Sequence, residues 1–108
     1  MTDFEKELIK NGYEEFDVPV FEKYASKFFQ KRVRDKDGIT KYFVNCFGYH
    51  LNEDDTITYE FELYVETGLC CIKTKLFAFT LDNLDLVKIE DKIEEIYQGI
   101  GDKLKEVE

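Results

Sequence analysis

The chain has 108 residues, of which 44% are hydrophobic, and its aromatic residues are ten Phe and seven Tyr. This length suits one domain with one hydrophobic core. The 15 Lys and Arg against 24 Asp and Glu give a formal net charge of −9, which argues against a protein that coats DNA through its phosphates. No apolar run approaches the ~18 residues of a membrane helix, and the acidic start MTDFEKEL is unlike a secretory signal. We therefore expect one domain over residues 1–108, located in the cytoplasm.

The three cysteines are Cys46, Cys70 and Cys71, an odd number that includes an adjacent pair. A disulfide between adjacent cysteines would close a strained ring, so we expect free thiols in a reducing compartment. The only histidine is His50, which leaves no complete set of nitrogen and sulfur ligands for zinc. We expect neither a metal nor a cofactor.

The first residues predict a short helix. Thr2 and Glu5 have the spacing of a capping box, in which each side chain binds the other's backbone N–H. Phe4 and Leu8 give an apolar stripe at helical spacing, and Gly12 suits a left-handed stop. Residues 13–26 are ambiguous because Pro19 breaks their regularity, although one further helical turn within 20–25 is possible.

From Lys27 the hydrophobic period changes from 3.6 to 2. This change predicts four strands, at residues 27–35, 39–51, 56–66 and 69–80. Turn residues separate them at Asp37-Gly38, at 52–55 and at Thr67-Gly68. The alternation of apolar and polar residues along 57–66 is typical of an antiparallel sheet with one buried face, so we expect a meander.

Two hairpin registers follow from these turns. A turn at Asp37-Gly38 sets Phe28 opposite Phe47 and Arg32 opposite Phe43. A two-residue turn at Thr67-Gly68 predicts the following opposite pairs: Val65 with Cys70, Leu63 with Ile72, Tyr59 with Leu76, Glu62 with Lys73, and Glu60 with Lys75.

The C-terminal segment predicts a longer helix, with an apolar stripe from Leu86 to Leu104 and possible N-caps at Asp82, Asn83 and Asp85. Gly99 and Gly101 weaken its far end. The predicted fold class is α+β: a four-stranded antiparallel meander sheet with a short N-terminal helix and a longer C-terminal helix, in the order α-β-β-β-β-α.

Residues 27–41 carry six basic and two acidic side chains, so the remainder of the chain is strongly acidic. One interpretation is a solvated hairpin whose charges prevent strand addition. The other is a basic strand, with Lys31, Arg32 and Arg34, that contacts phosphates or an acidic partner.

The outer face of the sheet is a second candidate surface. Phe28, Phe43 and Phe47 share a face in the first hairpin, and Tyr64 and Phe77 are expected to point away from the core. Either the N-terminal helix and residues 13–26 cover this face, or an aromatic patch is left for a second copy or a partner.

Catalytic patterns are missing from the sequence. Cys46 and His50 would lie roughly 13 Å apart along one strand, too far for a nucleophile and its base. The carboxylates at 53–55 and those of the C-terminal helix could imitate DNA phosphates, but their order is unlike that of a calcium loop, and charge is expected on the polar side of an amphipathic helix. We do not expect an enzyme.

The stretch FFQKRVRDKDGITKYFVNCFGYH, followed by TYEFELYV and a closing acidic helix, resembles small uncharacterised phage and prophage accessory proteins. The resemblance extends from about Phe28 to Tyr97. It implies a mobile-element origin, and hence the host cytoplasm as the location, but it implies no activity and no functional residue.

We therefore predict a non-enzymatic accessory protein that binds a macromolecule, either a protein partner or a second copy, with no membrane and no small-molecule substrate. Two alternatives stay open: an acidic DNA-mimic inhibitor of a nucleic-acid enzyme, and single-stranded nucleic-acid binding through the basic aromatic hairpin. The predicted partner-binding residues are Phe28, Lys31, Arg32, Arg34, Phe43, Tyr64 and Phe77.

Overall fold

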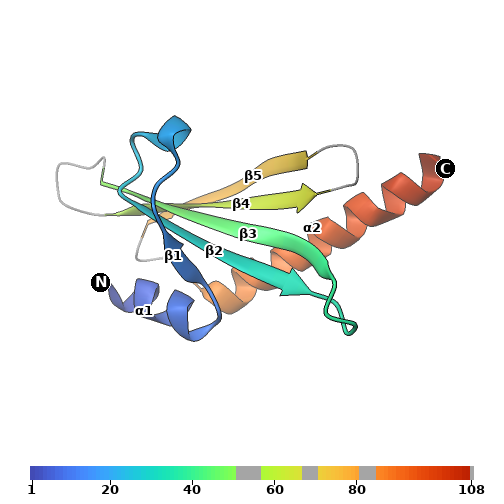
Figure 1. The fold of residues 1–108 in the computed structure, drawn as a ribbon, viewed down its shortest axis with the longest axis horizontal. Helices are drawn as coiled ribbons and strands as arrows, with labels where there is room; N and C mark the ends of the chain where they lie inside the picture. The colour runs from blue at the N-terminus through green and yellow to red at the C-terminus, as the bar shows by residue number, and fades with distance from the viewer. Residues whose placement is uncertain (51–56, 67–70, 81–84, 108) are drawn as a thin grey trace.

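A computed structural model describes residues 1–50, 57–66, 71–80 and 85–107, with side chains for 1–50, 57–66 and 85–100. It confirms the α+β class, with a short first helix, an antiparallel sheet and a long last helix (Figure 1). The elements in chain order are α1 (Asp3–Lys10), β1 (Glu14–Phe16), the 3-10 turn η1 (Val20–Glu22), β2 (Lys27–Arg34), β3 (Thr40–Tyr49), β4 (Thr58–Glu66), β5 (Cys71–Thr80) and α2 (Leu86–Val107).

The described strands form one sheet in the order β1-β2-β3-β4-β5, and every neighbouring pair is antiparallel. The four predicted strands are present as a meander. The sequence analysis missed β1, a fifth strand that adds Glu14–Phe16 to the edge of β2. Three residues are too few to show a period of 2 in the sequence. This segment is a strand only because it pairs with β2. The helical turn allowed within 20–25 is present as η1.

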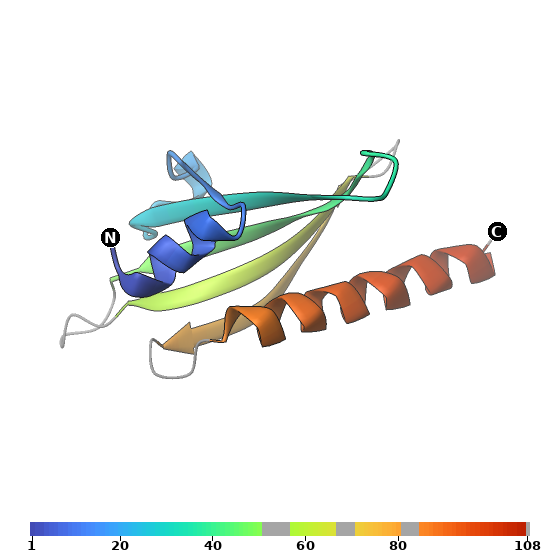
Figure 2. The same cartoon turned by 90° about the horizontal axis from the view of Figure 1, so that it is seen from below.

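Both helices lie on the same face of the sheet, which we call the core face (Figure 2). The ring of Phe4 in α1 packs against the ring of Tyr59, with the two ring centroids 4.9 Å apart. Ile93 of α2 is fully buried. Alternate residues of β3 and β4 complete this core, as expected for a sheet covered on one side.

The ends of α1 agree with the sequence. Thr2 and Glu5 make both hydrogen bonds of the predicted capping box. Gly12 has a φ of +97°, a left-handed conformation that glycine adopts without steric cost.

The predicted register of the first hairpin is confirmed, with Phe28 opposite Phe47 and Arg32 opposite Phe43. The turn itself is longer than two residues. Asp35 and Ile39 close it through a backbone bond of 2.8 Å, and Gly38 has a φ of +82°. A bulge after Val33 takes up the difference in length.

The predicted register of the last hairpin is wrong. Val65 lies opposite Ile72 and Glu62 opposite Lys75, a shift of two residues from the expected pairs. A shift of two keeps every residue on its face, so the hydrophobic alternation does not distinguish the two registers. A bulge between Phe61 and Glu62 then adds one more residue of offset. The turn at 67–70 lies outside the described residues.

Helix α2 begins after Asp85, whose side chain accepts from the Lys88 N–H at 3.3 Å; the other proposed caps, Asp82 and Asn83, lie outside the described residues. The helix continues through Gly99 and Gly101, and its far end projects past the sheet (Figure 2). Within the described ranges, no helix combines the length and the apolar character that crossing a membrane requires.

Candidate functional site

The face of the sheet opposite the two helices, which we call the outer face, carries three rows of side chains that run across β2, β3 and β4. In the first row Phe28 and Phe47 stack with ring centroids 4.9 Å apart, and Tyr49 lies beside Phe47. Val18 and Ala25, on the segment around η1, pack over this row. One end of the outer face is therefore a small second core.

The second row is polar. Gln30 donates to the Asn45 side-chain oxygen at 2.9 Å, and the Asn45 amide donates to Glu62 at 2.9 Å. Asn45 is buried, so these bonds satisfy an amide that would otherwise cost free energy on folding. The row holds its three side chains in fixed positions across three strands.

The third row consists of Arg32, Phe43 and Tyr64. The Arg32 guanidinium carbon lies 5.3 Å from the centre of the Phe43 ring, and the Phe43 and Tyr64 rings are 5.7 Å apart. The Tyr64 hydroxyl donates to Glu66 at 3.1 Å. Because cross-strand neighbours share a face, the confirmed register of β2 and β3 is what stacks Arg32 on Phe43.

Two hollows lie over these rows. The first, of about 390 Å³, is bounded by Pro19 and by Phe21 of η1, by Phe28 and Phe47 of the first row, and by the polar and third rows. The second, of about 460 Å³, lies toward β1, and Glu14, Phe16 and Arg34 are among its lining residues. Gln30, Arg32 and Phe43 line both hollows, so we treat them as one outer groove.

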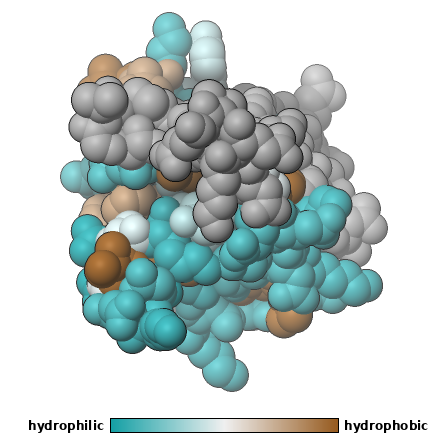
Figure 3. All heavy atoms as spheres, turned by 90° about the vertical axis from the view of Figure 1, so that its right-hand side faces the viewer, coloured by the Kyte–Doolittle hydropathy of each residue, from teal (hydrophilic) through white to brown (hydrophobic). Residues whose placement is uncertain are grey.

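The side of the groove formed by β1 and η1 is apolar and exposed. Phe21 is 69% exposed, Phe16 is 46% exposed, and Val20 and Tyr24 next to them are even more accessible. Large hydrophobic side chains grouped at the surface are typical of association surfaces. By contrast, the end of the molecule toward which α2 projects is mainly hydrophilic over its described residues, with separated hydrophobic spots (Figure 3).

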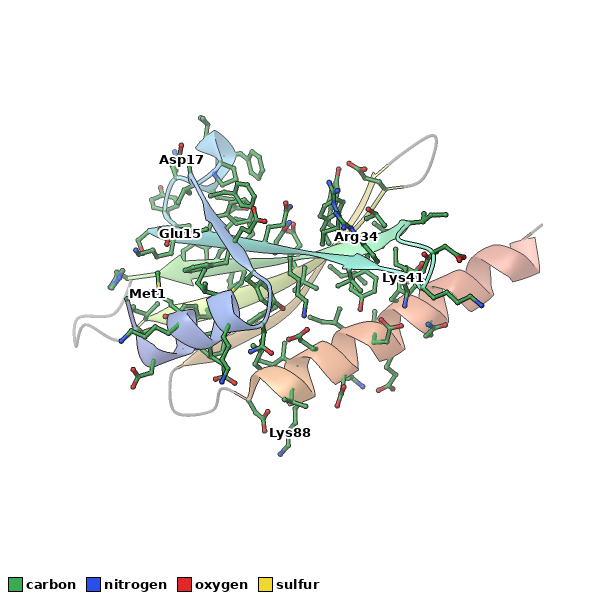
Figure 4. The ribbon with its side chains drawn as sticks, turned by 60° about the horizontal axis from the view of Figure 1, so that its bottom comes forward. Met1, Glu15, Asp17, Arg34, Lys41 and Lys88 are labelled. Atoms are coloured by element: carbon green, nitrogen blue, oxygen red, sulfur yellow. The ribbon has the colours of Figure 1, made fainter. Side chains whose placement is uncertain are left out.

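The basic residues of the first hairpin divide between the two faces. Lys31 pairs with Glu90 at 2.7 Å and Lys41 with Glu94 at 2.7 Å, both on α2. Arg34, by contrast, lines the outer groove, on the side of the sheet away from α2 (Figure 4).

Five of the predicted site residues line the outer groove: Arg32, Arg34, Phe43, Tyr64 and, from the covered first row, Phe28. The placement of Lys31 beside the two arginines is corrected, because alternation along β2 turns its side chain toward α2.

Phe28 lies on the expected face but is buried in the small second core. The corrected register sets Phe77 opposite Phe61, a core residue, which removes the reason for placing Phe77 with Tyr64. The side chain of Phe77 lies outside the described side chains.

The sequence analysis did not decide which residues cover the outer face. In the structure, the chain itself covers one part of this face and leaves the groove uncovered. The segment 17–26 covers the first row, whereas α1 lies on the core face. Phe16 and Phe21 were missed as groove residues, although two aromatics on either side of Pro19, in a segment without a regular helix or strand period, were a usable signal.

Cys46 and His50, the pair considered for nucleophilic chemistry, lie in different environments. Cys46 is fully buried, burial raises the pKa of its thiol, and His50 is exposed at the strand end. The buried Glu5 carboxylate accepts from the Tyr59 hydroxyl and from the Thr2 N–H, which explains it as a helix cap. In the described part of the chain, no group of three potential ligands could hold a metal ion.

The carboxylates considered for phosphate imitation are partly engaged. Glu90 and Glu94 pair with Lys31 and Lys41, while Asp91 and Glu95 are exposed. Residues 53–55 lie outside the described residues.

Comparisons of this chain with protein-family models, with curated proteins and with solved structures gave no match.

Proposed function

We propose that this protein is a non-enzymatic binding module that holds a protein partner in its outer groove. The observation that carries the proposal is the contrast between the two halves of the outer face. The Phe28–Phe47 row is covered by the chain's own segment 17–26, whereas the row of Arg32, Phe43 and Tyr64 faces an open groove. Aromatic and arginine side chains of this kind are the residues that most often dominate the affinity of protein interfaces.

The polar row supports specific recognition rather than non-specific hydrophobic association. Gln30, Asn45 and Glu62 are ordered by their mutual hydrogen bonds, so they present fixed donors and acceptors in the floor of the groove. A floor that is already ordered reduces the entropy lost on binding.

A single-stranded nucleic acid is the main competing occupant, since bases stack on aromatics of an open sheet face. A nucleic-acid strand carries a phosphate at every nucleotide, so along the groove it would also meet the carboxylates of Glu62 and Glu66, whereas a peptide can confine its charges to one end. We therefore favour a protein. The resemblance to phage and prophage accessory proteins and the cytoplasmic location stay predictions.

The test is a selection of displayed random peptides on the immobilised protein. We expect sequences enriched on the wild type to lose binding to the double variant Phe43→Ala/Tyr64→Ala. Val87→Ser, an exposed substitution on α2, is the matched control and should bind as the wild type does.

Three outcomes would overturn the proposal. One is the absence of any enriched peptide, and another is enriched peptides that bind the double variant equally well. The third is a fluorescent oligothymidylate that binds in a Phe43-dependent way while no peptide does. Circular dichroism and urea unfolding of each variant establish that it is folded.

A further inference from the structure

The charges of the outer groove do not balance locally. Lys27, Lys31 and Lys41 each have a carboxylate partner, but the side chains of Arg32 and Arg34 make no ion pair or hydrogen bond with any residue in the described part of the chain. Both arginines are exposed, and both line the second hollow. Among the residues that line the second hollow, the two arginines outnumber the one carboxylate, Glu14, so this hollow is locally positive in a chain of net charge −9.

The acidic residues near the two arginines either accept hydrogen bonds from other side chains or form no ion pair with the arginines. Glu62 accepts from Asn45, and Glu66 accepts from Tyr64. Glu14 lines the second hollow but forms no ion pair with either arginine. Among the described residues of the groove, Arg32 and Arg34 therefore present guanidinium donors that no described carboxylate engages.

Arg32 is also held in place before any ligand arrives. Its guanidinium lies over the Phe43 ring, which limits its rotamers while leaving its planar set of N–H donors available at the edge. A guanidinium presented in this way suits a carboxylate, which it can bind through two parallel hydrogen bonds.

The spacing of the two arginines suggests an extended ligand. They are two residues apart on β2, which corresponds to roughly 6.6 Å along a strand. Carboxylates at positions i and i+2 of an extended peptide have the same separation. The exposed rings of Phe16 and Phe21 on the same side could then receive an apolar residue of that peptide.

A second copy of this chain is the less favoured occupant. Each copy carries a formal net charge of −9, so two copies repel each other, and the exposed part of β2 is basic in both. A short acidic segment of a partner carries less charge than a second copy, and its carboxylates rather than a second basic strand face the arginines.

We infer that the occupant of the outer groove is an extended acidic peptide segment of a partner protein, with two carboxylates spaced i, i+2 and an apolar anchor. The carboxylates bind Arg32 and Arg34, and the anchor packs on the rings of Phe16 and Phe21. The inference rests on the proposed function and specifies its ligand.

The same displayed random library tests this inference through the charge of the enriched peptides. Against the wild type we expect enriched sequences to be net negative, with acidic residues two positions apart. Against Arg32→Glu/Arg34→Glu we expect the preference to reverse toward basic peptides. Arg34→Lys alone keeps the charge and should retain the preference for acidic sequences with weaker binding, because lysine cannot make the paired hydrogen bonds.

Synthetic copies of the most enriched peptide then provide affinities by fluorescence polarisation. We expect the double reversal to weaken binding at least ~10-fold, and binding to weaken as salt is raised toward ~0.5 M. An unrelated acidic peptide without an apolar residue should bind more weakly than the selected one.

The outcomes separate this inference from the proposed function. Enriched peptides that are neutral or basic, yet still depend on Phe43 and Tyr64, would overturn the acidic ligand and leave the protein-binding role standing. Acidic peptides that bind the double reversal as well as the wild type would also overturn it. If no peptide depends on the groove at all, both proposals fail, and a dimer detected by light scattering that is lost in Arg32→Glu/Arg34→Glu would point to self-association instead.

Discussion

The ammonium of Lys31 lies 2.7 Å from a carboxylate oxygen of Glu90, and this ion pair joins β2 to α2 across the core face. Lys41 makes a second such pair with Glu94, which also accepts the Tyr42 hydroxyl proton. Only part of each group is exposed, so water screens these pairs less than it screens pairs at the open surface. The long helix is therefore fixed on the first hairpin by polar contacts as well as by its apolar stripe.

Acid should weaken this attachment. Burial alone would raise the pKa of Glu94, but hydrogen bonds from Lys41, Tyr42 and Gln98 outweigh it and lower the pKa below the ordinary 4.5. Since the unfolded chain then binds the proton more readily, the stabilisation is present at neutral pH and is lost as the pH falls below about 4.5.

We expect Glu94→Gln to lower the free energy of unfolding by about 1 kcal/mol at neutral pH, and by less at about pH 3. Urea unfolding at both pH values measures the difference. Glu95→Gln is the control, because the Glu95 side chain is 71% exposed and its lysine partner is 3.5 Å away. An equal loss for Glu94→Gln at both pH values would contradict the prediction.

Two buried tyrosines should respond oppositely to loss of their hydroxyls. The Tyr13 hydroxyl is buried without a hydrogen-bond partner among the described residues, whereas the Tyr59 hydroxyl donates to Glu5 at 3.0 Å. Burial raises the pKa of both phenols. We expect Tyr13→Phe to leave stability unchanged or to increase it by up to about 1 kcal/mol, and Tyr59→Phe to cost about 1–3 kcal/mol. Thermal unfolding of the pair decides this, and a clear loss in Tyr13→Phe would count against it.

Two glycines should also respond oppositely when replaced by alanine. Gly99 lies within α2 with open space around it, so Gly99→Ala should stabilise the protein by about 0.5–1 kcal/mol through helix propensity. Gly38 has a φ of +82°, where a Cβ is strained, so Gly38→Ala should destabilise by about 1 kcal/mol. Chemical denaturation of both variants provides the measurement, and the same sign for both would refute the argument.

The small second core should be needed for folding, while the exposed groove wall should not. Phe47 is 4% exposed and stacks on Phe28, so Phe47→Ala should cost about 3 kcal/mol or more. Phe21 is 69% exposed, so Phe21→Ala should change stability by less than about 0.5 kcal/mol. If Phe21→Ala unfolds the chain, η1 is required for the stability of the fold and does not serve as a binding surface.

Much of the fold was available from local patterns. The capping box at Thr2 and Glu5 and the register of the first hairpin were predictable because each depends on residues close in sequence. The register of the last hairpin was not, because a shift of two residues preserves the alternation and the bulge at Phe61 leaves no sequence signal. Strand β1 could not be found alone, since its three residues become a strand only against β2.

The candidate site was predictable in part for the same reasons. The stacking of Arg32 on Phe43 follows from the hairpin register, and the orientation of Lys31 toward α2 follows from alternation along β2. The groove wall at Phe21 required knowing that segment 17–26 folds back over Phe28 and Phe47. That return depends on tertiary packing between residues distant in sequence, which a period of 2 or 3.6 does not encode.

The side chains of β2 have different roles on the two faces of the sheet. Residues 30, 32 and 34 line the outer groove, while Phe29 and Lys31 contribute to the attachment of the helices and the core. Positions 32 and 34 of this strand could therefore be randomised as a library, while Phe28, Phe29 and Lys31 keep the domain folded. The sheet would then serve as a scaffold for engineered binders, with specificity rewritten on one side only.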